Sequence, residues 1–354
     1  MSKRIIALLL ALVMVFALCA CGNGGNGGNS AGTEDVGDET YTIRIACENS
    51  DSYPATLGLY QMEKYVESHT NGKVQVEVCA SGQLGGEEET LEQVAQGNLE
   101  MAVASFAPVV SYVPEFEVMD IPFVYNSYTE AWMVLDSYVG TNLLDKMEAQ
   151  GLKGMAYMEN GMRQVTSNVS AINSIADFKG IKLRTMQNNN HMESFSALGA
   201  NPTPVAFSEL YISLSQKVVD AQENPIANVT DKKLYEVQKY LSLTNHIYDA
   251  MPLVCNLEFF NSLPQAYQKV VQAGAIYAQE FSRFCNLERE DLILADLTDK
   301  YGMQINEVSA DARAEMAKVA QPAVIKLVAK DIGQDAVDQY MNDVKDVLAQ
   351  ISKF

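Results

Sequence analysis

Short segments in which apolar and polar residues alternate are separated along the chain by amphipathic segments. Residues 41–47 and 74–80 alternate one by one, and the amphipathic residues 54–68 lie between them. Such alternation is typical of a β-strand, whereas apolar positions three and four residues apart are typical of an α-helix. The order strand, helix, strand indicates a βαβ unit and predicts a parallel sheet.

Two series of such elements follow one another. In the first, the pattern predicts helices at residues 87–97 and 129–150 and strands at residues 100–105 and 153–158. The second series runs from about residue 161 to 250. We expect its strands at residues 163–167, 181–186, 218–224 and 240–244, and its helices at residues 175–178, 188–200, 207–217 and 226–237. Two α/β series predict two α/β domains.

A long helical segment follows at residues 264–299, with no proline after Pro264. At ~1.5 Å per residue such a helix is about 50 Å long, which is too long for one small domain. We expect it to span both domains. Two more helices are predicted at residues 310–330 and 334–351. We assign the domains to residues 41–160 plus about 252–290, and to residues 161–251 plus about 291–354.

The N-terminus has the features of an export signal. Lys3 and Arg4 precede an apolar run at residues 5–20, which ends in small residues before Cys21. The run is shorter than the ~20 residues that a membrane span needs, so it indicates a secretory signal peptide at residues 1–20 rather than an uncleaved membrane anchor. Its end is similar to the bacterial lipoprotein box, in which the cysteine after the cleavage site is lipidated. Residues 21–40 are rich in Gly, Asn and Ser and predict a flexible tether.

Charge and motifs exclude several classes of function. The chain has 25 Lys and Arg against 45 Asp and Glu, a net charge of −20, and so acidic a surface repels nucleic acid. It lacks the sequence motifs of phosphate-binding loops, serine hydrolases and zinc proteases, and its histidines are far apart. We therefore predict no enzyme activity, no cofactor and no metal site. The residues leave open whether a disulfide or buried free thiols occur among Cys47, Cys79, Cys255 and Cys285.

Arginine is scarce after the signal segment, and only Arg163 and Arg184 lie in the second α/β series. Arg184 is near the carboxyl end of its predicted strand, where open α/β sheets bind their ligands. A guanidinium group matches a carboxylate with two parallel hydrogen bonds, which a lysine cannot do. The residues by themselves leave open whether each arginine binds a ligand or forms a surface ion pair.

Five sequence blocks in the second series resemble one family of transport proteins. They are ENGMRQVTSN, INSIADFKGIKLRT, LGANPTPVAFSELY, VVDAQENP and YEVQKYLSLTNH, in this order. From about residue 41 onward, the chain is similar to the solute-binding proteins of tripartite ATP-independent periplasmic (TRAP) transporters of the dicarboxylate-binding DctP type. The resemblance implies a two-domain α/β fold like that of periplasmic binding proteins, with a ligand cleft and a long helix spanning both domains. It also implies membrane permease subunits as partners, which use an ion gradient.

The resemblance further implies which residues bind the ligand. Arg184 corresponds to the arginine that grips the ligand carboxylate, and Arg163 to a second arginine that reaches the ligand. Asn224 corresponds to an amide donor and Phe207 to an aromatic packing surface, while Gln187 lies where the family varies its ligand contact. Two residues at the ends of first-domain strands correspond to positions that shape ligand choice, Glu48 and Ser105.

These features predict an extracytoplasmic, lipid-anchored and monomeric solute-binding protein that captures a carboxylate, such as a sugar acid or a C4-dicarboxylate. One departure from the family is Ala221, which stands where a glycine is usual before QENP. Two alternative functions stay open. One is a sensory protein that presents the same ligand to a membrane receptor kinase. The other is a secreted enzyme that acts on the same acid through a group such as Glu48 or His191.

Overall fold

The first elements of the described chain form a parallel βαβαβ arrangement. The computed structural model describes residues 38–350. Strand β1 (Tyr41–Ala46) pairs in parallel with β2 (Val74–Cys79) and with β3 (Met101–Val103). The predicted βαβ unit is therefore confirmed. The connecting helices are α2 (Pro54–His69) and α3 (Glu87–Ala95).

The predicted signal peptide, the lipidation site Cys21 and the tether up to residue 37 lie outside the described residues. Among residues 38–350, the structure contains no helix that is both long enough and apolar enough to traverse a bilayer. The cysteines of this part of the chain are buried free thiols: Cys47, Cys79, Cys255 and Cys285.

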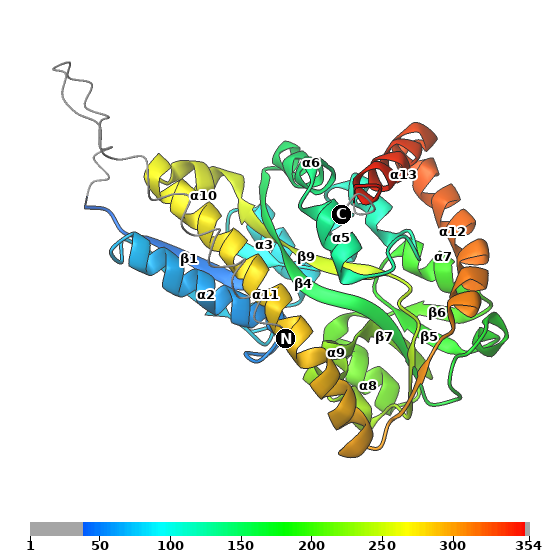
Figure 1. Cartoon of the computed structure of the whole chain (residues 1–354). Coiled ribbons are helices and arrows are strands. Elements are labelled where there is room, and N and C mark those ends of the chain that lie inside the picture. The colour runs from blue at the N-terminus through cyan, green and yellow to red at the C-terminus, as the bar shows by residue number, and fades with distance from the viewer. Residues whose placement is uncertain (1–37, 351–354) are drawn as a thin grey trace, which may run out of the picture. The chain divides into compact units, whose positions relative to one another are not determined.

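Two long antiparallel strands, β4 (Leu152–Ser167) and β9 (Tyr248–Asn256), run through the middle of the sheet (Figure 1). The prediction of separate strands at residues 153–158 and 163–167 is wrong, because the chain continues without a turn between them. Gly161, at φ +124°, lies at an irregularity in the pairing with β9, and a β-bulge of this kind resembles a strand break in the sequence. No strand is predicted at β9, because all its residues are buried and its sequence does not alternate.

The second series continues the same sheet. Strand β7 (Ala221–Pro225) pairs antiparallel with β4 and parallel with β5 (Lys182–Thr185), which pairs in turn with β6 (Asn201–Pro204). The order of the strands is β2-β1-β3-β9-β4-β7-β5-β6. Strand β8 (Tyr240–Leu243) joins β4 to β10 (Gln304–Glu307).

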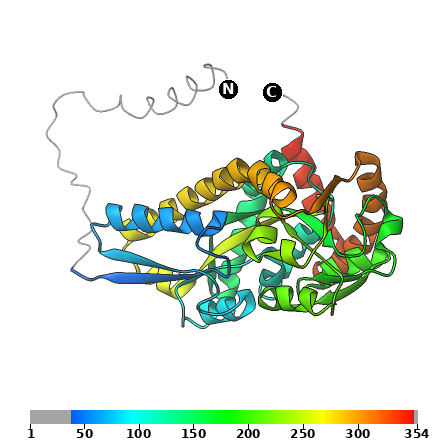
Figure 2. The same cartoon turned by 90° about the horizontal axis from the view of Figure 1, so that it is seen from below.

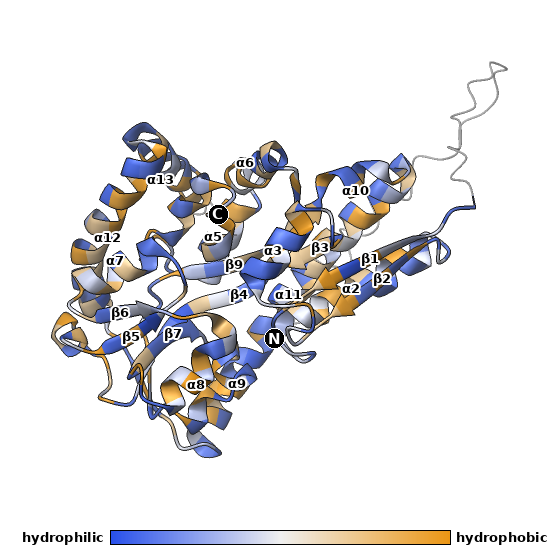
Figure 3. Ribbon diagram, turned by 180° about the vertical axis from the view of Figure 1, so that it is seen from behind, coloured by the Kyte–Doolittle hydropathy of each residue, from blue (hydrophilic) through white to orange (hydrophobic). Residues whose placement is uncertain are grey.

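Strand β7 is polar although it is buried. All its residues are buried, and they include Gln222, Glu223 and Asn224. Figure 3 shows this strand in hydrophilic colours deep within the fold. Buried polar groups require hydrogen-bond partners, so β7 marks a polar interior next to the middle of the sheet.

Three predicted helices are shorter than the sequence pattern indicates. Residues 129–150 divide at Ser137, whose Oγ accepts a hydrogen bond from the N–H of Val139 (3.1 Å) and so caps a second helix. The other two end two residues before a left-handed residue, Lys217 or Lys233, with φ of 59° and 52°. The resulting helices are α5 (Tyr128–Leu135), α6 (Tyr138–Lys146), α8 (Leu210–Ser215) and α9 (Ile226–Asp231), with short 3-10 turns at Met147–Gln150, Phe207–Glu209 and Leu234–Glu236.

The predicted long helix is α11 (Gln265–Asp299), and α2 packs along it (Figure 2). Two glycines allow this close approach. A Cβ atom at Gly58 would lie 2.5 Å from the carbonyl oxygen of Ala278, and one at Gly274 would lie 2.8 Å from Cγ2 of Val66. Helix α11 also packs against β4 and α9, and so contacts elements of both predicted domains.

The chain ends with α12 (Ala310–Ile332) and α13 (Gln334–Leu348), close to the predicted bounds. Helix α12 packs on α7 (Asn189–Ala197), while α13 packs on α5 and α6. The described residues 38–350 all belong to one compact unit, and the domain boundaries stay a prediction. The remaining short helices are α4 (Phe106–Val109), α10 (Leu257–Ser262) and the 3-10 turns Pro114–Asp120 and Ile175–Phe178.

Candidate functional site

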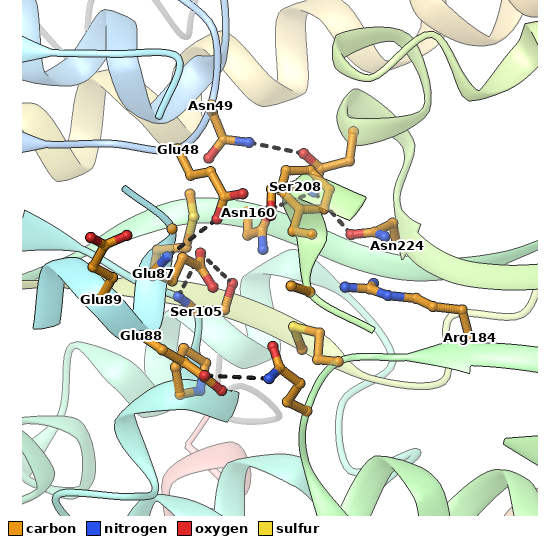
Figure 4. A pocket seen from close by; sticks show the side chains of 18 residues that line it. Glu48, Asn49, Glu87, Glu88, Glu89, Ser105, Asn160, Arg184, Ser208 and Asn224 are labelled. Atoms are coloured by element: carbon orange, nitrogen blue, oxygen red, sulfur yellow. Dashed lines mark hydrogen bonds between the residues drawn. The ribbon is translucent and has the colours of Figure 1, made fainter. Parts of the chain in front are cut away.

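A cavity of about 270 Å³ lies where the loops after β1 and β3 and the start of α3 meet β4, β5 and β7 (Figure 4). Its size suits a small molecule. Six of the seven residues that the resemblance implies as ligand contacts line it: Glu48, Ser105, Arg184, Gln187, Phe207 and Asn224. The other lining residues are Asn49, Gly86, Glu87, Glu88, Glu89, Pro108, Asn160, Met186, Ala206, Ser208, Asn228 and Met251.

Arg184 supplies the positive charge of this cavity. Its side chain is 1% exposed, its Nε donates to the carbonyl oxygen of Val205 (2.9 Å), and its Nη1 has no hydrogen-bond partner among the described residues. Burial lowers the pKa of this guanidinium to about 10, which leaves it charged at neutral pH. Figure 4 shows it directed into the cavity. A buried cation with an unbonded N–H group and no ion pair is costly, and an anionic ligand at Nη1 would reduce that cost.

Two carboxyl groups lie on the opposite side. Glu87 Oε1 accepts hydrogen bonds from the N–H and Oγ of Ser105 (3.0 Å each), and Glu48 Oε2 accepts one from the N–H of Glu87 (3.3 Å). Burial, together with the charge of Glu48, raises the pKa of Glu87 to about 8. Burial also raises the pKa of Glu48, against the opposing effect of Lys232. This side therefore favours a carboxyl pair that retains a proton near neutral pH.

Four asparagines form a connected amide network at the cavity. Asn224 Nδ2 donates to Gln222 Oε1 (2.6 Å), and Asn224 Oδ1 accepts from Asn228 Nδ2 (3.2 Å). Asn228 also bonds to Asn160 (3.1 Å) and to Asn49 (3.0 Å). The amides thus link the loop after β1 to strand β4 and helix α9. They offer both donors and acceptors to a bound molecule.

The cavity entrance combines an aromatic ring with polar side chains. Lys232 Nζ lies 4.5 Å from the centre of the Phe207 ring, a cation–π contact. Gln187 Nε2 donates to Glu88 Oε2 (3.3 Å), which connects the loop after β5 to the start of α3. Both Gln187 and Glu88 are exposed, so a ligand that enters the cavity could break this hydrogen bond and bind to either side chain.

Arg163 is the predicted contact that does not line the cavity. It is fully buried, and it forms ion pairs with Glu223 and with Asp249, the latter at 2.7 Å. Its Nη2 also donates to the carbonyl oxygen of Glu223 (2.8 Å). Each nitrogen of its guanidinium group therefore already has an acceptor. Asp249 Oδ2 also accepts a hydrogen bond from Asn160 (2.8 Å), which lines the cavity. Arg163 is therefore connected to the cavity through Asp249 and Asn160 rather than by lining it.

The comparisons with known proteins decide the family. The model of the bacterial extracellular solute-binding proteins, family 7 (DctP), matches residues 45–331. The chain belongs to the DctP family. The predicted kinship with the solute-binding proteins of TRAP transporters is thereby confirmed, and so is the two-domain α/β class of fold. Members of the DctP family act outside the cytoplasm.

DctP relatives are similar over most of their length. The chain is 32% identical over 298 residues to a solute-binding protein of Verminephrobacter eiseniae, covering 84% of this chain and 88% of the relative. It is 31% identical to the C4-dicarboxylate-binding periplasmic protein DctP of Rhodobacter capsulatus, covering 84% and 90%. It is 30% identical to the 2,3-diketo-L-gulonate-binding periplasmic protein YiaO of Escherichia coli, covering 72% and 77%.

Solved structures of the DctP type share the fold. The sugar acid binding protein of Advenella mimigardefordensis, in complex with galactonate, superposes with a TM-score of 0.83 at 32% identity, covering 87% of this chain and 99% of that one. A TRAP solute-binding protein of Sulfurospirillum deleyianum with bound succinate gives 0.78 at 30% identity, covering 85% and 98%.

Several residues that line the cavity are not predicted from the sequence. Glu87 is not distinguished from other acidic residues in the first turn of a helix, where negative charge is favourable in any protein. Asn228 lies on α9, four residues after Asn224 at the end of β7, and this short separation is a signal that the sequence contains. Asn160 and Asn49 carry no such signal, because their role depends on partners far along the chain.

Proposed function

We propose that this TRAP solute-binding protein captures a small organic acid in the cavity, with Arg184 as the carboxylate clamp, and delivers it to membrane permease subunits. The observation that carries the proposal is the Nη1 atom of Arg184, which is buried and lacks a partner among residues 38–350. A carboxylate there would receive a charge-assisted hydrogen bond in a largely desolvated place. Galactonate and succinate, bound in the two similar structures, both carry such a group.

The other lining residues complete the proposed site. Asn224 has a second amide N–H to offer the carboxylate, and the Phe207 ring supplies an apolar surface for the carbon chain. Gln187, Glu48 and Ser105 would set ligand choice. Arg163 acts as a positioning residue, since it holds Asp249 and through it Asn160.

We further propose binding without turnover. Glu48 lines the cavity, but no described histidine does, and His191 is buried between Asp120 and Glu223. The support for binding without turnover is the similarity to solute-binding proteins whose structures hold galactonate and succinate. Recovery of the unchanged ligand after prolonged incubation, measured by mass spectrometry, is the expected result.

Lipid anchoring at Cys21 and a monomeric state are part of the proposal. The small residues before Cys21 and the Gly-, Asn- and Ser-rich stretch after it support a lipid anchor followed by a tether. We expect Cys21→Ser to release the protein from membranes. The predicted domains would close over the ligand as β4 and β9 flex between them.

A thermal-shift screen of organic acids tests the proposed function. A ligand at 100 times its dissociation constant adds ~2.7 kcal/mol of stability, so carboxylates that bind should raise the melting temperature clearly. Their amide analogues should not. If no organic acid stabilises the protein, the proposed function is wrong.

A further inference from the structure

The cavity holds two buried polar atoms that lack partners among the described residues, and they require opposite chemistry. Nη1 of Arg184 is a charged donor, and Oε1 of Glu48 is an acceptor. Arg184 belongs to β5, whereas Glu48 follows β1. Figure 4 shows the two side chains entering the cavity from different sides. A ligand that satisfies both has an anionic group for one side and a hydrogen-bond donor for the other.

The groups around Glu48 extend this acceptor side. Glu87 is held next to it by the 3.3 Å hydrogen bond from its own N–H to Glu48 Oε2. Ser105 and Asn49 line the same part of the cavity. Carboxyl, hydroxyl and amide groups together suit several hydroxyl groups, each of which both donates and accepts a hydrogen bond.

From these contacts we infer that the cavity selects polyhydroxy monocarboxylic acids, with the carboxylate on Arg184 and the distal hydroxyl groups donating to Glu48 and Glu87. This inference rests on the proposed function and narrows it to one class of ligand. C4-dicarboxylates are disfavoured, because their second carboxylate would meet the carboxyl pair of Glu48 and Glu87, which still carries negative charge when it shares one proton.

A ligand with a distal ammonium group also fits poorly. Lys232 already brings a positive charge to the neighbourhood of Glu48, with its Nζ 3.5 Å from the carbonyl oxygen of Glu48 and 4.5 Å from the centre of the Phe207 ring. A second cation there would be repelled by Lys232. Hydroxyl groups are uncharged and meet no such repulsion.

Titration calorimetry with ligands of equal chain length tests this selectivity. D-erythronate, succinate and 4-aminobutyrate each have a four-carbon chain with a carboxylate at one end. The rest of the chain carries hydroxyl groups in D-erythronate, a second carboxylate in succinate and an ammonium group in 4-aminobutyrate, and D-galactonate adds a longer hydroxy acid. We expect at least one of the two hydroxy acids to bind ten-fold or more tightly than succinate and 4-aminobutyrate. Succinate or 4-aminobutyrate binding as tightly as the better hydroxy acid would overturn the inference.

A variant of Glu48 measures how much this side of the cavity contributes to ligand selectivity. Glu48→Gln keeps the shape but removes the charge, and we expect hydroxy-acid affinity to fall about ten- to a hundred-fold while succinate affinity rises. Glu92→Gln is the matched control, because Glu92 is exposed on α3 and does not line the cavity. Unchanged affinities in Glu48→Gln, with folding verified by circular dichroism, would contradict the inference.

The two proposals fail in different ways. If succinate binds best and Arg184→Ala abolishes its binding, the carboxylate clamp stands and only the selectivity for hydroxy acids is wrong. If none of the four acids binds and no other organic acid stabilises the protein, the proposed function itself is wrong.

Discussion

Arg163 and Glu223 form an ion pair in which both side chains are fully buried. The carboxylate of Glu223 also accepts a hydrogen bond from His246 Nε2 (3.1 Å), and His191 Nδ1 lies 3.6 Å away. Burial alone would raise the pKa of Glu223, but Arg163 and the two histidines hold it well below its usual value. Glu223 directly precedes Asn224 on β7, so this charged cluster stiffens the strand that carries a proposed ligand contact.

Substitution of Arg163 should therefore lower the stability of the folded protein more than it affects direct contact with the ligand. Arg163→Ala removes the arginine that pairs with the buried carboxylates of Glu223 and Asp249, and we expect a loss of about 3–5 kcal/mol in the free energy of unfolding. Arg163→Lys should recover part of this loss, because it restores the charge but not the planar guanidinium. Urea denaturation monitored by circular dichroism measures both. Weakened binding by Arg163→Ala at unchanged stability would instead indicate direct ligand contact.

Arg163 also shows what the sequence could predict and what it could not. The resemblance implies that both Arg163 and Arg184 contact the ligand, yet only Arg184 lines the cavity. The acidic partners of Arg163 lie 60 and 86 residues further along the chain. Such pairings depend on strand order, here on β7 and β9 flanking β4. The sequence does predict that Glu48 and Ser105 lie at the ends of strands. Glu48 follows a strand with alternating apolar and polar residues, and Ser105 ends a short apolar run.

The long helix gives a second example. The helical pattern predicts α11 to within one residue, because no proline interrupts it. Its neighbour α2 is likewise predicted, but not the contact between them, which depends on small residues in two distant segments. Gly58 is one of these residues.

Gly58→Ala should destabilise the protein. The added methyl group would lie 2.5 Å from the carbonyl oxygen of Ala278 and 2.8 Å from Cε of Met158, so α2 and α11 would have to separate. We expect a cost of about 1–3 kcal/mol, although alanine ordinarily favours a helix. Lys64→Ala, at an exposed position of α2, is the matched control. A Gly58→Ala variant as stable as this control would show that the helices are loosely packed.

His191 should make stability depend on pH above neutrality. Burial disfavours its charged form, but Asp120 and Glu223 outweigh this effect and raise the pKa of His191 to about 9. Because the folded pKa exceeds the unfolded value of ~6.5, the stabilisation is complete below about pH 6.5 and is lost as the pH rises through about 9.

Comparison with His191→Gln isolates this contribution, since other groups titrate in the same range. The difference in unfolding free energy between the two proteins should shrink by up to about 3 kcal/mol between pH 6 and pH 10. Denaturant titrations at several pH values measure it. A difference that does not vary with pH would mean that His191 is uncharged in the folded protein.

The affinity of Arg184→Ala for a carboxylate ligand is the decisive measurement for the proposed carboxylate clamp. Truncating one partner of a buried charge pair costs roughly 2–5 kcal/mol. The affinity measured by calorimetry should therefore fall by a factor between about 30 and a few thousand. Stability without ligand should not fall, because the variant removes a buried charge that lacks a partner at Nη1. Arg313→Ala, on α12 and outside the cavity, should bind like the wild type. Binding by Arg184→Ala within three-fold of the wild type would contradict the carboxylate clamp.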